Sequence, residues 1–204
     1  MEKELMMTLA DPKRNETVLD LGCGTGIYSL ELAKKGLKVT GMDISEEMLK
    51  QARKKAIQSG YDLDLISGDF HTLPFEDEVF DLVITNITLE FADDPKRVVS
   101  EAMRVLKTGG CFVAGFIGKH SSWGKIYQKK GESDSNSVFS KAVFFTPEDI
   151  NSLYKYKPDN LLFGLYIDSE EFLNEIQAME LELKRRAFHP IEEAGFMAVK
   201  WIKG

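Results

Sequence analysis

The sequence feature that most constrains the fold is the nonamer V-L-D-L-G-C-G-T-G at positions 18–26, where an apolar run ends in a carboxylate and three alternating glycines. A helical pattern of apolar residues begins directly after it. A strand, a glycine turn and a helix in this order bring main-chain N–H groups and a helix N-terminus beside a ligand. Glycine suits such a turn because a positive φ and the close approach of a ligand both exclude a Cβ atom. The nonamer therefore predicts a ligand-binding strand–turn–helix unit.

The spacing of the glycines narrows the class of ligand. A dinucleotide fingerprint, G-x-G-x-x-G, needs a third glycine where this chain has Ile27, and a phosphate-binding P-loop is broken by Ile27 and Tyr28. Asp20 stands at the end of the strand and would repel a pyrophosphate. A carboxylate at that place favours a cation, and S-adenosylmethionine carries an ammonium group and no phosphate. The turn therefore favours this cofactor over a dinucleotide.

Further motifs follow in order along the chain. Asp43 ends the next predicted strand, residues 37–43, at an offset that places a carboxylate at the tip of the neighbouring strand. Its two oxygens can accept hydrogen bonds from both ribose hydroxyls, and the alternative is a solvated turn or capping residue. Gly68-Asp69-Phe70 follows a third strand, and L-P-F-E-D-E-V-F-D at 73–81 precedes an apolar strand that ends at Asn86.

Over about residues 16–117 these motifs together resemble the class I S-adenosylmethionine-dependent methyltransferases, in particular the ubiquinone and menaquinone biosynthesis type, also called type 11. The resemblance implies S-adenosylmethionine as cofactor and S-adenosylhomocysteine as product. It also implies an acid that accepts from the adenine amine (Asp69) and an apolar cover for the ring (Phe70), although Asp69 can be a plain turn residue and Phe70 a core residue. The cofactor-binding residues it implies are Asp20, Gly22, Cys23, Gly24, Thr25, Gly26, Asp43, Ile44, Asp69, Phe70 and Asn86. Ile87 and Glu90 are further candidates near the substrate, with a solvated or capping acid as the alternative for Glu90.

The expected fold class is α/β, a Rossmann-like doubly wound sheet of seven strands with helices on both faces. The apolar runs predict strands at 17–21, 37–43, 63–68, 82–86, 111–117, 161–167 and 196–202, with helices between them. The family resemblance implies that the last strand is antiparallel and lies between the fifth and the sixth. A long helix is expected over 169–188, with an apolar stripe that belongs to the core or to a dimer contact: Phe172, Ile176, Met179 and Leu183.

The length of 204 residues fits one domain, 1–204, in which 1–15 and 118–146 are expected to cover the substrate; the alternative for 118–146 is a surface insertion without function. Its serine-rich part, 131–137, is expected to be mobile. A net charge of −7 disfavours a nucleic-acid partner. Cys23 and Cys111 lack metal-ligand spacing, so no metal is expected. The first residues do not read as a signal peptide, which predicts a cytoplasmic protein, either a monomer or a homodimer.

The expected reaction is direct in-line transfer of a methyl group to a small-molecule acceptor, which requires alignment of donor and acceptor more than a catalytic triad. A general base is useful only for a hydroxyl or an acidic carbon, and His120 and Tyr127 are the candidates. His71 is expected to be structural or exposed. The sequence Asn86-Ile87-Thr88-Leu89 lacks the prolines and the aromatic residue of base-modifying relatives. A non-catalytic S-adenosylmethionine-binding protein and an NAD-dependent oxidoreductase remain as alternatives.

Overall fold

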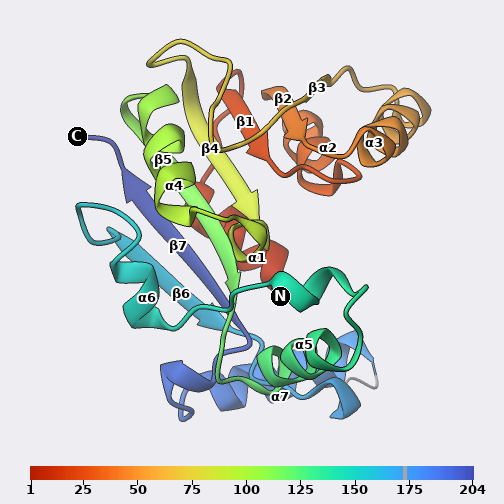
Figure 1. The fold of residues 1–204 in the computed structure, drawn as a ribbon, viewed down its shortest axis with the longest axis vertical. Coiled ribbons are helices and arrows are strands. Elements are labelled where there is room, and N and C mark those ends of the chain that lie inside the picture. Colours follow the sequence, from red (N-terminus) through yellow and green to blue (C-terminus); the bar gives the residue numbers. More distant parts are fainter. Residues whose placement is uncertain (172–173) are drawn as a thin grey trace.

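The computed structural model describes residues 1–171 and 174–204, and its sheet confirms the predicted fold class (Figure 1). Seven strands lie in the order β3-β2-β1-β4-β5-β7-β6 within these residues. All neighbouring pairs are parallel except those of β7, which runs antiparallel to β5 and to β6. The strands are β1 Thr17–Leu21, β2 Lys38–Asp43, β3 Asp64–Ser67, β4 Phe80–Asn86, β5 Leu106–Ile117, β6 Asn160–Gly164 and β7 Phe196–Ile202.

Helices connect the strands, and their starts follow the capping residues of the sequence. Ser45, Asp94 and Thr146 each accept a hydrogen bond from a main-chain N–H three residues later, which satisfies a donor that the helix leaves unpaired. The α-helices are α1 Glu2–Ala10, α2 Ile27–Lys34, α3 Glu46–Ser59, α4 Pro95–Val105, α5 Ser122–Ser133, α6 Pro147–Asn151 and α7 Glu175–Arg186. The short 3-10 turns are η1 Leu89–Phe91, η2 Val138–Lys141, η3 Ser169–Glu171 and η4 Ile191–Glu193.

The sheet is covered on both faces because successive residues of each strand point to opposite sides. Val83 of β4 packs in one apolar cluster with α4, and the next residue, Ile84, packs in a second cluster with α1 and α2. Leu5, Met6 and Leu9 of α1 lie on one side of the helix and are buried. The two clusters fix the strand ends that carry the candidate site.

Several predicted elements differ from the structure. β6 ends at Gly164, three residues before the predicted strand, because Leu165 takes a left-handed conformation. The described part of the long helix predicted over 169–188 consists of η3 and α7. β5 begins at Leu106, five residues before the predicted strand, because Leu106 pairs with Phe80 of β4 and extends the sheet. Residues 131–133, expected in a mobile linker, form the last turn of α5. In α7 the stripe predicted for the core or a dimer contact is not in the core of this chain: Ile176 and Leu183 are 75% and 59% exposed, whereas Ala178 and Glu182 are buried. A dimer contact along this stripe stays a prediction. Phe172 lies outside the described residues.

The segment 118–146 lies beyond the end of the sheet to which β4 and β5 point (Figure 1). It contains α5 and η2, and residue 118 forms an isolated bridge to Phe145 at its far end. Among the described residues, no helix is long and apolar enough to cross a membrane, and no group of His, Cys, Asp and Glu side chains could hold a metal ion.

Candidate functional site

A cavity of about 420 Å³ opens where β1, β2 and β4 end, which is the edge at which open α/β sheets bind ligands. We call it the cofactor cleft. It is lined by Gly22, Gly24, Asp43, Ile44, Ser45, Met48, Phe70, Ile87, Thr88, Phe91 and Val138. Five of the residues predicted to bind the cofactor are therefore in its wall: Gly22, Gly24, Asp43, Ile44 and Phe70.

The glycine turn is held against β2 by its own main chain. The N–H groups of Gly22 and Cys23 both donate to the carbonyl of Met42, at 2.8 and 3.0 Å. Gly22 has φ +67°, and a Cβ atom there would come 2.4 Å from Cγ2 of Thr88. Gly24 has φ +53°, and a Cβ atom there would meet nothing within 4 Å. The first glycine is thus required by packing, and the second leaves open space beside the cavity.

Asp43 joins the turn to the start of α3. Its Oδ2 accepts from the N–H of Gly24 at 2.8 Å, and its Oδ1 accepts from the N–H of Ser45 at 2.8 Å. A carboxylate oxygen can accept more than one hydrogen bond, so each oxygen keeps capacity for a ligand. The half-buried carboxylate therefore lies in the wall of the cleft with a fixed orientation.

Asp20 lies beneath the turn. It is 3% exposed, and its Oδ2 accepts from the hydroxyl of Ser29 at 2.5 Å. The pKa of Asp20 is raised to about 6, mainly by burial. The hydrogen bonds from Ser29 oppose the rise, and the nearby charge of Asp43 contributes to it. A cation in the cleft would favour the ionised form of this group.

The end of β4 forms the other side of the cleft. Asn86 pairs with Gly115 of β5, and Ile87 then takes a left-handed conformation with φ +52°, which turns the chain into η1. Oδ1 of Asn86 is buried without a hydrogen-bond partner among the described residues. A Cβ atom at Gly115 would come 2.3 Å from that oxygen, so the glycine makes room for the amide.

Neither Asp20 nor Asn86 lines the cavity, and the remaining predicted cofactor residues do not line it either. Cys23 is buried, Thr25 accepts from Nζ of Lys55 at 2.7 Å, and Gly26 begins α2 against Ala52. The carboxylate of Asp69 is exposed and binds its neighbour His71, through the main-chain N–H at 2.9 Å and the ring at 2.7 Å. These hydrogen bonds hold the pKa of Asp69 below its usual range.

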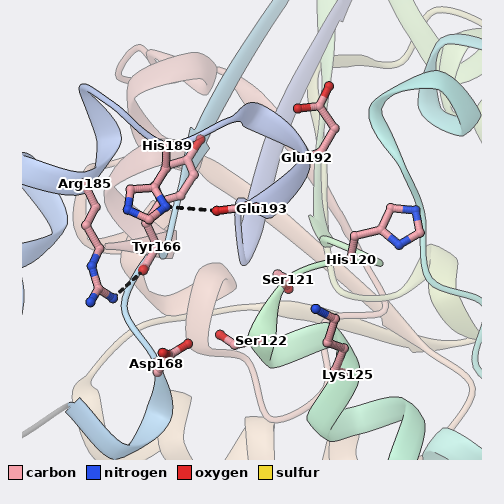
Figure 2. Close-up of a pocket in the computed structure, with 10 residues that line it drawn as sticks. All are labelled: His120, Ser121, Ser122, Lys125, Tyr166, Asp168, Arg185, His189, Glu192 and Glu193. Carbon is pink, nitrogen blue, oxygen red and sulfur yellow. Dashed lines mark hydrogen bonds and ion pairs between the residues drawn. The ribbon is translucent and has the colours of Figure 1, made fainter.

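The two candidate general bases lie apart from each other. His120 lines a second, larger cavity of about 610 Å³ between α5 and the chain around α7, together with Lys125, Tyr166 and Asp168 (Figure 2). Tyr127 stacks on Phe139 with a centroid distance of 4.6 Å, and burial raises its pKa. Neither side chain lines the cofactor cleft.

An aromatic contact links Tyr127 to the cleft wall. The ring of Phe139 lies 6.0 Å from that of Phe91, which lines the cleft. Phe91 and Val138 are 40% and 70% exposed, so apolar surface borders the cavity on the side of η1 and η2. Tyr127 is therefore one aromatic ring removed from a residue of the cleft.

Sequence reasoning missed several lining residues. Ser45 follows the predicted strand end at Asp43 by two residues, and this position points to the ligand edge. Met48 follows one turn later, and the same reasoning applies to it. Thr88 and Phe91 follow β4 in the same way. Val138 carries no such signal, because η2 reaches the cleft from a segment about fifty residues further along the chain.

Comparison with known proteins agrees with the geometry. A family described as “Methyltransferase domain” matches residues 19–114. An uncharacterized protein of Methanocaldococcus jannaschii is 36% identical over 137 residues, which are 67% of this chain and 61% of that protein. Malonyl-[acyl-carrier protein] O-methyltransferase of Hamiltonella defensa is 40% identical over 106 residues, 52% of this chain and 39% of that protein. The chain thus spans about three fifths or less of these two relatives.

A solved structure covers the whole chain. The S-adenosylmethionine-dependent methyltransferase from Thermotoga maritima, described as a possible histamine N-methyltransferase, superposes with a TM-score of 0.77 at 26% identity. The alignment covers 100% of this chain and 87% of that one. The agreement therefore includes α5, η2 and the last two strands, which lie outside the family match.

Proposed function

Because the chain belongs to the family of S-adenosylmethionine-dependent methyltransferases, we propose that it transfers a methyl group from S-adenosylmethionine to a small-molecule acceptor. The observation that carries the proposal is the cleft itself. A carboxylate, Asp43, is fixed by two main-chain N–H groups beside a glycine turn, and a second carboxylate, Asp20, lies buried beneath the turn. Two acids favour a cationic nucleoside over a pyrophosphate.

The residues of the cleft fit this cofactor. Asp43 is proposed to accept from the ribose hydroxyls, and the apolar side chains of Ile44, Met48 and Phe70 suit the adenine ring. The unpartnered Oδ1 of Asn86 is proposed to accept from the ammonium group of the methionine end. Asp69 retains its proposed role at the adenine amine.

The rest of the turn has a supporting role in the proposal. Gly22 and Gly24 let the main chain approach the cofactor, and Cys23, Thr25 and Gly26 hold the turn against β2 and α3. Asp20 is proposed to act on the cofactor through its charge, since its carboxyl is buried and hydrogen-bonded to Ser29.

The cofactor supplies a methyl group on a sulfonium, from which the thioether of S-adenosylhomocysteine is a good leaving group. The chain has to bind and orient the two reactants and to exclude water, and orientation of this kind contributes on the order of 7–11 kcal/mol. Phe91 and Val138 are proposed to cover the transfer site, because their exposed apolar side chains border the cleft. His120 and Tyr127 remain proposed general bases for a hydroxyl or acidic carbon acceptor.

The proposal treats 1–204 as one domain, with 1–15 and 118–146 as the segments that cover the substrate. A small metabolite is proposed as the acceptor, supported by the name of the malonyl-[acyl-carrier protein] relative and by the net charge of −7, which disfavours nucleic acid. A cytoplasmic location and a monomeric or homodimeric state complete the proposal.

Calorimetry with S-adenosylmethionine, S-adenosylhomocysteine and NAD tests the cofactor. We expect binding of the first two and none of NAD, whereas tight binding of NAD alone would refute the proposal. Transfer of a labelled methyl group to components of a metabolite extract then distinguishes an enzyme from a non-catalytic binding protein. Binding of the cofactor without any labelled product across such extracts would favour the binding protein.

A further inference from the structure

Glu90 is a buried acid directly behind the wall of the cofactor cleft. It lies in η1 between the lining residues Thr88 and Phe91, and it is 1% exposed. Among the residues that the structure describes, it forms no ion pair. Its Oε1 accepts from the N–H of Ile117 at 2.8 Å, and its Oε2 is buried with no partner among those residues. Burying a carboxyl with one unpartnered oxygen costs free energy, so its hydrogen bond to Ile117 needs an explanation.

The reason lies in the way β4 leaves the sheet. The N–H of Ile87 still donates to the carbonyl of Gly115 at 2.9 Å, in the parallel ladder with β5. If β4 continued in this register, the carbonyl of Ile87 would accept from the N–H of Ile117. The left-handed conformation of Ile87 instead turns the chain into the cleft wall. The carboxyl of Glu90 takes the place of the missing carbonyl.

The main chain of Glu90 makes a second connection. Its carbonyl accepts from the N–H of Val143 at 2.8 Å, and two residues later the carbonyl of Phe145 accepts from the N–H of Lys119 at 2.9 Å. Residues 143–145 therefore continue the edge of β5 from which β4 has departed. Glu90 holds the chain both where segment 118–146 leaves the sheet, at Ile117, and where it returns, at Val143.

We propose that Glu90 is a positioning residue of the methyl-transfer site, which fixes η1 and both ends of segment 118–146 against the end of β5 and so sets the shape of the cofactor cleft. The inference rests on the proposed function for the identity of the ligand. The clamp itself rests on the hydrogen bonds of Glu90 to Ile117 and Val143.

The surroundings indicate which variant should preserve the clamp. Burial raises the pKa of Glu90 to about 8, against the opposing effect of the main-chain N–H groups of Ile117 and of Glu90 itself, and no charged side chain contributes. The carboxyl is therefore largely neutral at pH 7. Glutamine has the same shape and keeps a carbonyl oxygen for Ile117, whereas leucine removes the acceptor and aspartate is one methylene shorter.

Glu182 offers a control that differs from Glu90 in one respect, since its Oε1 also forms an ion pair with Arg186 at 3.1 Å. It is also fully buried, and its carboxylate accepts from the N–H groups of Leu165 and Tyr166, at 2.8 and 2.7 Å, after the end of β6. It does not line the cofactor cleft. Loss of Glu182 should thus measure the general effect of removing a buried carboxyl that accepts main-chain hydrogen bonds.

The experiment compares the variants Glu90→Gln, Glu90→Leu, Glu90→Asp and Glu182→Leu. S-adenosylhomocysteine affinity is measured by calorimetry, the folded fraction by urea unfolding, and the exposure of the Ile117 and Val143 N–H groups by hydrogen exchange. We expect Glu90→Leu and Glu90→Asp to weaken affinity by roughly tenfold or more and to speed exchange at the Ile117 N–H, which loses its side-chain acceptor. Exchange at Val143, which bonds the main-chain carbonyl of Glu90, then reports whether η1 has shifted. Glu90→Gln should stay within about threefold of the wild type, and folded Glu182→Leu should keep its affinity.

Unchanged affinity in folded Glu90→Asp, or an equal loss in Glu182→Leu, would overturn the inference. If Glu90→Leu does not fold, Glu90→Asp and Glu90→Gln still decide it. Failure of the wild type to bind S-adenosylhomocysteine would instead refute the proposed function. In that case, exchange at Ile117 still tests the clamp, because this N–H group reports on the Glu90 carboxyl without a ligand.

Discussion

Replacing Asp43 by alanine should weaken cofactor binding by about 1–3 kcal/mol, which is roughly 5- to 150-fold in affinity. The carboxylate is proposed to accept from the ribose hydroxyls, and hydrogen bonds to a charged group fall in this range. The same substitution removes acceptors from the N–H groups of Gly24 and Ser45, each at 2.8 Å. The fold should therefore lose stability as well, toward the low end of that range per bond because the site is half-buried.

Calorimetry can separate the two effects if the ligand is varied together with the protein. S-adenosylhomocysteine and its 2′-deoxy analogue are titrated into the wild type and into Asp43→Ala, and urea unfolding gives the folded fraction of each. We expect the wild type to prefer the hydroxylated ligand and the variant to lose that preference. The coupling between the substitution and the missing hydroxyl isolates the direct contact from the general loosening of the turn.

Asp43→Asn provides a control with nearly the same shape. Its amide can accept from only one of the two N–H groups, and its NH2 group then faces the other donor. We expect the affinity of Asp43→Asn for S-adenosylhomocysteine to be lower than that of the wild type too. If folded Asp43→Ala discriminates against the deoxy ligand as strongly as the wild type, Asp43 does not contact the ribose.

Three further predictions test other parts of the site. The pKa of Asp20 is raised to about 6, and a bound cation would favour its ionised form. The affinity for S-adenosylmethionine, measured by calorimetry, should therefore fall as the pH drops through about 6. In Asp20→Asn the affinity should not change over this pH range. Gly22→Ala should lower the free energy of unfolding in urea more than Gly24→Ala, since only the first Cβ meets Thr88, and equal losses would contradict this. The pKa of Glu90 is about 8, against 4.5 for an ordinary glutamate, so between these values the folded state holds a proton that the unfolded state has lost. The free energy of unfolding of the wild type should therefore fall, relative to that of Glu90→Gln, by up to roughly 1.4 kcal/mol per pH unit between pH 5 and 8. A difference in urea unfolding that stays constant with pH would refute this.

Local signals predicted the parts of the molecule that local chemistry determines. Glycines at fixed spacing predicted the turn. Ser45, Asp94 and Thr146 are of the residue types that favour helix starts, and each satisfies a donor only three residues away. The position of Asp43 in the cleft followed from its place at a strand end. Segment 118–146 was predicted to cover the substrate, but the sequence did not predict that Val138 is its residue at the cleft, because this depends on how the segment folds.

Candidates chosen by residue type alone were less informative. His120 and Tyr127 are both titratable residues after β5, yet the first lines a separate cavity and the second stacks on Phe139. A side chain near the start or in the middle of a helix can point to either side, and the loop before α5 sets that direction. Spacing along the chain therefore predicted the segment near the site but not the side chains that reach it.

Buried acids explain why the apolar stripe of α7 is exposed, and they explain the role inferred for Glu90. At the end of β6, Leu165 has φ +61°, and Glu182 receives the N–H groups of Leu165 and Tyr166. At the end of β4, Ile87 has φ +52°, and Glu90 receives the N–H of Ile117 across the gap. In both places a strand ends at a left-handed residue, and a carboxyl accepts the main-chain hydrogen bonds there, from helix α7 at β6 and from η1 at β4.

Hydrophobic patterns assign such acids to the surface, because a glutamate is seldom fully buried. In α7 this reverses the buried face, so that Glu182 points inward with Ala178 while Ile176 and Leu183 are exposed. A left-handed, non-glycine residue is equally hard to recognise from sequence. At these two strand ends the turn leaves a main-chain N–H without a main-chain acceptor, and the acid satisfies it. Of the two acids, Glu90 lies beside the cofactor cleft, which is why its loss should affect binding as well as stability.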